Sequence, residues 1–256
     1  MNTRLRSSGL VLAFLTSITV AADTPSAARR AKVTPVYKEY KVVDVKDGGS
    51  IEGVVLFKGK VPPPEKIAIV KDQPTCGHHP AERKLIDVND EGQVKNAVVF
   101  LNIKQGKAPA KNDKKPTIDQ KSCSFQPYVE VVEKNQLFDI VNSDPVAHNI
   151  QAEQNLRTAF NHLQPQQGMV QEEKFKEVGL AKLQCQAHNW MRAWRYVLPH
   201  PYHAVTGEKG TFKIADIPPG EYELHVWQEK TGEQMQKIKI EAGKATKVEF
   251  ELTSGK

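Results

Sequence analysis

Two short stretches of the sequence contain four residues of types that bind soft metals. Cys185, His188 and Met191 follow one another at intervals of three, and His148 lies upstream in Asn142-Ser-Asp-Pro-Val-Ala-His148-Asn149. Two imidazoles and a thiolate in a trigonal plane, with a weak axial thioether, hold a redox-active copper ion. These residues therefore predict one mononuclear copper site.

The spacing within the second stretch argues against a regular element. On a helix, positions i, i+3 and i+6 fan around the axis, and on a strand the first and second of them point to opposite faces. A tight loop lets all three side chains converge. We therefore expect residues 185–191 to form a loop between two strands, with His148 brought in by a separate strand.

Each of these residues also has an ordinary structural explanation. A single buried cysteine is often inert packing, and Met191 lies between Trp190 and Trp194, where it would fill a core. The joint occurrence of all four residue types favours the metal site.

The two stretches resemble the copper loops of cupredoxins, the plastocyanin and amicyanin group. In that family a His followed by Asn near a strand end is joined by Cys-x2-His-xn-Met near the C-terminus, and the short Cys-x2-His-x2-Met form here is most similar to amicyanin. Residues 185–194 and 200–206 resemble bacterial plastocyanin-like proteins related to methylamine utilisation. The resemblance, over residues 48–230, implies a cupredoxin-like Greek-key sandwich and a copper cofactor.

The resemblance also implies roles for individual residues. Cys185, His148, His188 and Met191 would be the ligands, and Asn149, next to His148, would tie the two ligand loops together through its side chain or backbone. The edge of His188 would lie near solvent, where a redox partner docks.

Two positions depart from the family pattern. Tyr128 stands where relatives commonly have His after Phe-x-Pro, and Asn189 stands where they commonly have Pro. We expect the first change to remove a hydrogen bond behind the ligands or a second ligand, and the second change to loosen the loop.

Strand-like patterns run through most of the remaining sequence, and helical periodicity is almost absent, so we expect an all-β protein. Residues 133–136 are expected to turn a hairpin, as is Pro218-Pro219-Gly220 within 204–227, whereas 153–169 is expected to be irregular. The other expected strands are 37–45, 49–59, 67–70, 84–88, 95–103, 125–132, 137–141, 174–178, 180–185, 236–240 and 247–252.

The C-terminal pattern Val-Thr-x3-Gly-x-Phe-x-Ile-x-x-Ile-Pro-Pro-Gly-x-Tyr-x-Leu resembles the closing half of a carboxypeptidase regulatory-like, transthyretin-like sandwich, and Gly49–Val55 resembles its opening half. This resemblance implies a discontinuous sandwich of residues 47–112 and 201–256, with a cupredoxin-like copper domain at 113–200 inserted into it. The alternative is two consecutive domains, in which the strands near residues 51 and 98 belong to the copper domain.

The N-terminus has the features of a secretory signal. Arg4 and Arg6 precede an apolar run at 9–20, which is too short to span a bilayer, and Val20-Ala-Ala22 supplies small residues for cleavage. We expect residues 1–22 to be a cleaved signal peptide and 23–46 a flexible leader. The mature protein is then periplasmic or secreted, with no membrane span. A buried N-terminal helix is the alternative.

The number of cysteines is odd. If Cys185 is the metal thiolate, Cys76 and Cys123 remain to form a disulfide in an oxidising compartment. The alternative is that Cys76, His78 and His79 form a second metal site, although no fourth ligand presents itself.

Composition excludes several classes of function. The net charge is +6, with basic and acidic residues interleaved, and no basic, aromatic-rich stripe points to nucleic acid. Hydrolase, zinc-protease and phosphate-loop motifs are absent, so we expect no enzyme.

We expect an exported copper protein that carries single electrons between redox partners, such as a cytochrome or a dehydrogenase. The alternatives are a non-catalytic binding or scaffold module with a vestigial metal site, and a protein for copper storage or delivery.

Overall fold

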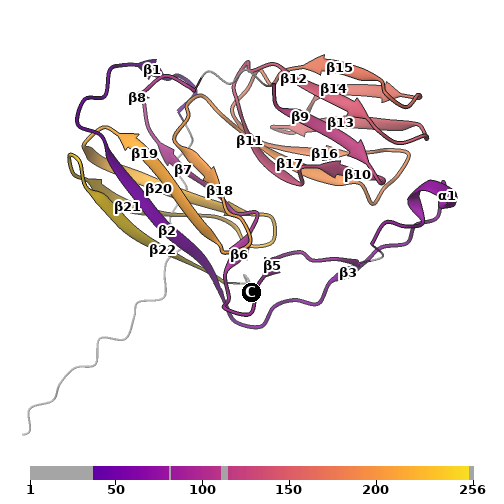
Figure 1. The fold of residues 1–256 in the computed structure, drawn as a ribbon, viewed down its shortest axis with the longest axis horizontal. Coiled ribbons are helices and arrows are strands. Elements are labelled where there is room, and N and C mark those ends of the chain that lie inside the picture. The colour runs from indigo at the N-terminus through magenta and orange to yellow at the C-terminus, as the bar shows by residue number, and fades with distance from the viewer. Residues whose placement is uncertain (1–36, 81, 111–114, 254–256) are drawn as a thin grey trace, which may run out of the picture. The chain divides into compact units, whose positions relative to one another are not determined.

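The computed structural model describes residues 37–80, 82–110 and 115–253 (Figure 1). These residues belong to one compact unit of the chain, Ala31–Lys256. The expected signal peptide, residues 1–22, lies outside the described residues. No helix in the described part of the chain is long and apolar enough to cross a membrane.

The described residues form an almost purely β structure. They contain 22 strands and one helix of four residues, α1 (Gln73–Cys76). The expectation of an all-β protein is confirmed.

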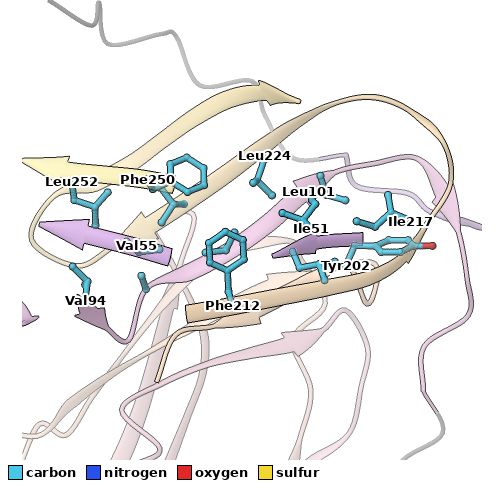
Figure 2. Close-up of a cluster of buried hydrophobic side chains, with 14 of the residues drawn as sticks. Ile51, Val55, Val94, Leu101, Tyr202, Phe212, Ile217, Leu224, Phe250 and Leu252 are labelled. Atoms are coloured by element: carbon cyan, nitrogen blue, oxygen red, sulfur yellow. The ribbon is translucent and has the colours of Figure 1, made fainter. Parts of the chain in front are cut away.

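Seven strands form a first sandwich of two sheets, in the orders β18-β7-β20-β21 and β19-β2-β22 (Figure 1). Alternation of side chains explains the layers: in β19, Phe212 and Ile214 are buried while Thr211 and Lys213 are exposed. Figure 2 shows the core of this sandwich, to which both sheets contribute. The strands are β2 (Gly49–Lys58), β7 (Val98–Asn102), β18 (His203–Val205), β19 (Thr211–Ile217), β20 (Gly220–Gln228), β21 (Gly232–Ile240) and β22 (Ala245–Thr253).

The expected hairpin at Pro218-Pro219-Gly220 is wrong. β19 pairs with β2, whereas β20 pairs with β7 and β21, so the chain crosses from one sheet to the other at this turn. The reason is that both strands bury one face in the same core. Period-two alternation predicts which face of a strand is buried. It does not predict which strand lies beside it in the sheet.

Nine strands form a second sandwich, with sheets in the orders β10-β9-β12-β15 and β11-β17-β16-β13-β14. Both sheets contribute to its core, in which the rings of Phe138, Phe160 and Phe175 lie 5.3 to 6.0 Å apart. The strands are β9 (Thr117–Lys121), β10 (Ser124–Gln126), β11 (Val129–Glu133), β12 (Phe138–Asn142), β13 (His148–Gln154), β14 (Arg157–Gln164), β15 (Val170–Glu173), β16 (Gly179–Gln184) and β17 (Arg192–Leu198).

Among the described residues, no strand ladder joins the two sandwiches. Every strand of the second sandwich lies between Thr117 and Leu198, and the strands of the first lie on both sides of this range. The division of the chain into the domains 47–112 with 201–256, and 113–200, stays a prediction.

Three local expectations for the second sandwich are wrong. Residues 153–169 are not irregular, because they contain the end of β13 and all of β14, an edge strand whose mostly exposed polar residues hide the alternation. No hairpin forms at 133–136, because β11 pairs with β17 and β12 with β9 and β15. Residues 174–178 form no strand, although Phe175 is buried in the core.

The remaining strands form three short ladders. β1 (Lys41–Val42) pairs with β8 (Gln105–Gly106), β3 (Glu65–Lys66) with β4 (Glu82–Arg83), and β5 (Asp87–Val88) with β6 (Val94–Lys95). The expected strand at 67–70 is absent. Residues 67–80 instead carry α1 and are called the cap segment below.

Candidate metal centre

The second sandwich brings the two predicted ligand stretches to one end of a sheet. His148 is the first residue of β13, and Cys185 follows the last residue of β16. Because β13 and β16 are antiparallel neighbours, with Gln151 opposite Gln184, the start of one strand lies beside the end of the other.

The loop that follows Cys185 is tight, as its spacing predicts. The backbone N–H of Cys185 donates to the carbonyl of Met191 at 3.2 Å, and the N–H of Met191 donates to the carbonyl of His188 at 2.9 Å. The chain therefore turns back within seven residues and enters β17, the antiparallel partner of β16.

Three of the four predicted ligands lie around a common point. The Nδ1 atoms of His148 and His188 are 3.0 Å apart, and Cys185 Sγ is 3.6 Å from His188 Nδ1. Both imidazoles are fully buried, and Cys185 is 3% exposed. Met191 is buried too and lies at the end of the same loop.

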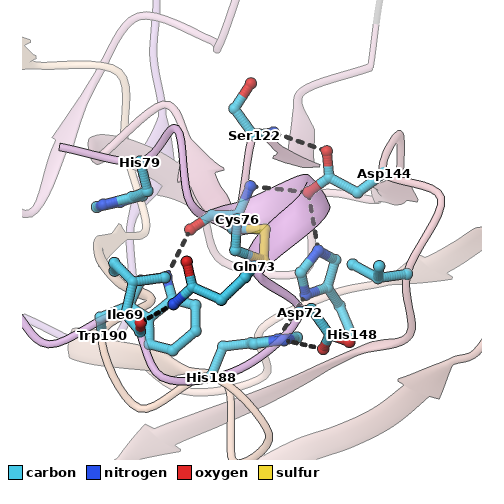
Figure 3. The surroundings of a disulfide bond; sticks show 12 residues. Ile69, Asp72, Gln73, Cys76, His79, Ser122, Asp144, His148, His188 and Trp190 are labelled. Atoms are coloured by element: carbon cyan, nitrogen blue, oxygen red, sulfur yellow. Dashed lines mark hydrogen bonds and ion pairs between the residues drawn. A yellow bond between two sulfur atoms is a disulfide. The ribbon is translucent and has the colours of Figure 1, made fainter.

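Each imidazole donates a hydrogen bond from its Nε2 atom to a carboxylate. His148 Nε2 lies 2.8 Å from Asp144 Oδ2, and His188 Nε2 lies 2.7 Å from Asp72 Oδ2 (Figure 3). An ionised carboxylate only accepts, so Nε2 carries a proton in both rings. In the neutral form of each ring, the Nδ1 atom then has a free lone pair that can bind a metal. Burial lowers the pKa of His148, which also favours the neutral ring.

This donor set fits a soft metal ion. Two Nδ1 lone pairs 3.0 Å apart repel unless a cation lies between them, and the Cys185 sulfur adds a soft ligand. Carboxylates behind ligating imidazoles are the usual means of fixing the tautomer and orientation of such rings.

Asn149 connects the two ligand stretches. Its backbone N–H donates to Cys185 Sγ at 3.4 Å, and its side-chain Oδ1 accepts from the N–H of Gln186 at 2.7 Å. The Nδ2 group donates to Asn161 on β14.

The expectation that His188 has an edge near solvent does not agree with the structure. The His188 ring is buried because the cap segment lies against it, with Asp72 at its Nε2. The Trp190 ring packs beside it, with ring centroids 5.0 Å apart, and its Nε1 donates to the carbonyl of Cys123 at 3.2 Å (Figure 3).

A disulfide joins Cys76, at the end of α1, to Cys123, between β9 and β10. The alternative second metal site at Cys76, His78 and His79 is not assembled, because this sulfur is bonded and His79 Nδ1 contacts the Pro80 carbonyl. Cys123 also lies near Asp144 and His148, but its sulfur is held in the disulfide and offers no thiolate.

The two positions that depart from the family pattern lie outside this arrangement of ligands. The Tyr128 hydroxyl donates to Glu229 and accepts from Arg192 Nε at 3.3 Å, and burial raises the pKa of Tyr128 to about 12. Asn189 is exposed in the loop.

Sequence reasoning missed both carboxylates. Asp144 lies four residues before His148 in the same motif, and this proximity was a usable signal. Asp72 lies 116 residues before His188 and has no such signal.

Comparisons with known proteins give partial matches. A family model described as polysaccharide lyase family 4, domain II, matches residues 174–248. It is not the carboxypeptidase regulatory-like model that the C-terminal pattern led us to expect. No curated protein matches the sequence.

Among solved structures, the chain is similar to three copper proteins over 32% to 39% of its length. The purple cupredoxin from Nitrosopumilus maritimus is 22% identical, with a TM-score of 0.29 over 32% of this chain and 98% of that chain. A Cu(I) structure of an amicyanin mutant is 15% identical, with a TM-score of 0.30 over 39% and 97%. The copper-containing nitrite reductase from Thermus scotoductus SA-01 is 19% identical, with a TM-score of 0.29 over 35% and 24%.

Proposed function

We propose that this chain is an exported, cupredoxin-type protein that binds one copper ion and carries single electrons between redox partners. The observation that supports the proposal most strongly is the convergence of two imidazole Nδ1 atoms and one thiol sulfur in a buried site. Zinc would accept the same donors, but a pair of imidazoles with one thiolate, and a methionine at the end of the same loop, is the set typical of electron-transfer copper.

The bound copper would supply a one-electron couple at a thiolate-bearing centre. The protein's part is to hold His148, His188 and Cys185 in one geometry for both oxidation states. β13, β16 and β17 provide this rigidity, because they are hydrogen-bonded neighbours in one sheet. Met191 would supply a weak thioether donor to the copper.

The hydrogen bond from the Asn149 N–H to Cys185 Sγ would tune the site. By drawing electron density from the sulfur, it would make the Cys185 thiolate a weaker donor, and this would favour the reduced form of a bound copper ion. Burial of the centre keeps water away and acts in the same direction.

The cellular setting is also part of the proposal. The signal-like N-terminus supports export, and a disulfide between Cys76 and Cys123 persists most readily in an oxidising compartment. The partners would be redox proteins such as a cytochrome or a dehydrogenase. We assign no enzymatic activity, no nucleic-acid binding and no membrane span.

A colour test decides between this function and its rivals. Cu(II) added to the purified mature protein should give an intense thiolate-to-copper absorption band, and Cys185→Ser should abolish it. The matched control is Gln186→Ala, at the exposed neighbouring position, which should keep the band.

Two results would contradict the electron carrier. A colourless wild-type protein that binds copper weakly would favour the scaffold module. A coloured protein that loses its copper rapidly to a mild chelator would favour copper delivery. The burial of all three donors argues for retention of the metal.

A further inference from the structure

We propose that the cap segment, residues 67–80, is a closed lid on the metal centre, in which Asp72 positions His188 and shields it from solvent and external ligands. The identity of the metal rests on the proposed function. The lid itself is a property of the protein without metal.

The cap segment is fastened to the second sandwich by several kinds of contact. The Cys76–Cys123 disulfide fixes one end covalently, across a sequence separation of 47 residues. Ile67 and Ile69 pack against the core of the second sandwich. Beyond the segment, Arg83 donates to the carbonyl of Trp190.

The side chain of Asp72 binds His188 and does not cap its own helix. It is the residue before α1, where aspartate commonly caps the first turn through its side chain. Here the side chain makes no such bond, and the backbone is left-handed, with φ 50° and ψ 42°. The carboxylate instead accepts from His188 Nε2 at 2.7 Å.

Asp72 also forms the wall between His188 and water. The His188 side chain is fully buried, whereas the Asp72 side chain is 34% exposed. Any small ligand that approaches this edge of the ring meets Asp72 first. Removal of the carboxylate would free Nε2 and would let the ring turn or exchange tautomer.

The disulfide links the supports of both imidazoles. Asp144 Oδ2 accepts from the N–H of Cys123 at 2.8 Å and from His148 Nε2. The carbonyl of Asp72 accepts from the N–H of Cys76 at 2.8 Å. The disulfide therefore joins Cys123, whose N–H binds the Asp144 carboxylate, to Cys76, whose N–H binds the main-chain carbonyl of Asp72. Figure 3 shows the disulfide beside both aspartates.

Two substitutions at position 72 separate the hydrogen bond from the backbone conformation. Asp72→Gly removes the acceptor and tolerates the left-handed backbone, and Asp72→Asn keeps both an acceptor oxygen and that conformation. Lys71→Ala, at the exposed neighbouring position, is the matched control.

The first readout uses the metal-free protein. Nitrogen-15 NMR of the His188 ring should show the proton on Nε2 in the wild type, Lys71→Ala and Asp72→Asn, and a mixture of tautomers in Asp72→Gly. Amide hydrogen exchange over residues 67–80 should also be faster in Asp72→Gly and in the Cys76→Ser/Cys123→Ser double variant. If the double variant does not fold, the Asp72 variants still test the lid proposal.

The second readout is the rate at which bound copper is lost to a chelator. Loss of such a carboxylate partner typically weakens metal binding 10- to 100-fold, so Asp72→Gly should lose copper about 10- to 100-fold faster than Lys71→Ala. The lid proposal would be overturned if Asp72→Gly had the same His188 tautomer, the same amide exchange over residues 67–80 and the same rate of copper loss as the wild type. A wild type without a thiolate band would overturn the copper function and leave the metal-free measurements of the lid valid.

Discussion

At the scale of single residues, Asp144 organises more of the candidate site than any predicted ligand does. Its carboxylate accepts from the N–H of Ser122 at 2.7 Å, from the N–H of Cys123 at 2.8 Å, and from His148 Nε2. Asp144 therefore connects the loop that carries Cys123, one of the two disulfide residues, to the ring of His148.

We predict that Asp144→Ala lowers both stability and metal binding. The substitution leaves three N–H donors in or near the protein interior without their acceptor, and the expected loss in the free energy of unfolding is about 2 to 3 kcal/mol. Urea unfolding of the metal-free protein measures it. Asp90→Ala, at an exposed turn, is the control and should change stability little. A loss no larger than that of the control would contradict this role for Asp144.

The sequence could predict the residue types of the centre but not its surroundings. His148, Cys185, His188 and Met191 were found because their types and spacing suit one kind of metal, and the first three do converge. Asn149 entered through the family resemblance. Asp72 could not be found, because its contact with His188 depends on how a segment 116 residues away folds back.

At the scale of elements, close packing between strands limits what the first sandwich tolerates. Gly53 lies inside β2, between its neighbours β19 and β22. A Cβ at this position would lie 2.2 Å from the carbonyl oxygen of Val248 and 2.6 Å from the Phe212 ring. The backbone oxygen cannot move without disturbing the ladder between β2 and β22.

We therefore predict that Gly53→Ala destabilises the protein by about 1 to 3 kcal/mol through overpacking. Thermal unfolding of the metal-free protein measures the effect. Gly207→Ala is the matched control, since a Cβ there meets no atom within 4 Å. Equal melting temperatures for the two variants would show that β2 and β22 can separate at little cost.

The elements themselves were only partly predictable. Alternation located β2, β12 and β16 to within a few residues, because each buries one face in a core, and a continuous apolar run located β7, which is buried on both faces. It could not say which strands pair, and so it placed a hairpin where the chain crosses between sheets at Pro218. β14 was missed because an edge strand with mostly polar residues lacks the alternation.

At the scale of the whole molecule, the chain passes from the second sandwich to the first through residues 199–202. His200 in this link is fully buried, and its Nδ1 accepts from the N–H of Tyr202 at 3.2 Å. The Tyr40 ring packs beside it, with centroids 5.6 Å apart. Burial lowers the pKa of His200 to about 3 and that of His203 to about 4.

This burial makes the whole fold sensitive to acid. The pKa of His200 is lower in the folded than in the unfolded chain, so the unfolded chain binds more protons between about pH 6.5 and pH 3. The stabilising contribution is present in full above about pH 6.5 and is lost as the pH falls toward 3. Between pH 6.5 and 4.5, His200 alone should remove about 2 kcal/mol, since one pKa unit corresponds to about 1.4 kcal/mol.

The variant His200→Gln isolates this contribution, because glutamine keeps an acceptor for the Tyr202 N–H and cannot be protonated in this range. Urea unfolding of both metal-free proteins from pH 7 to pH 4 should show a steeper loss of stability in the wild type. The acidic groups and His203 are present in both proteins, so their titration largely cancels in the difference. Parallel curves would mean that His200 becomes protonated in the folded protein at its ordinary pKa, and that the link between the sandwiches opens to water.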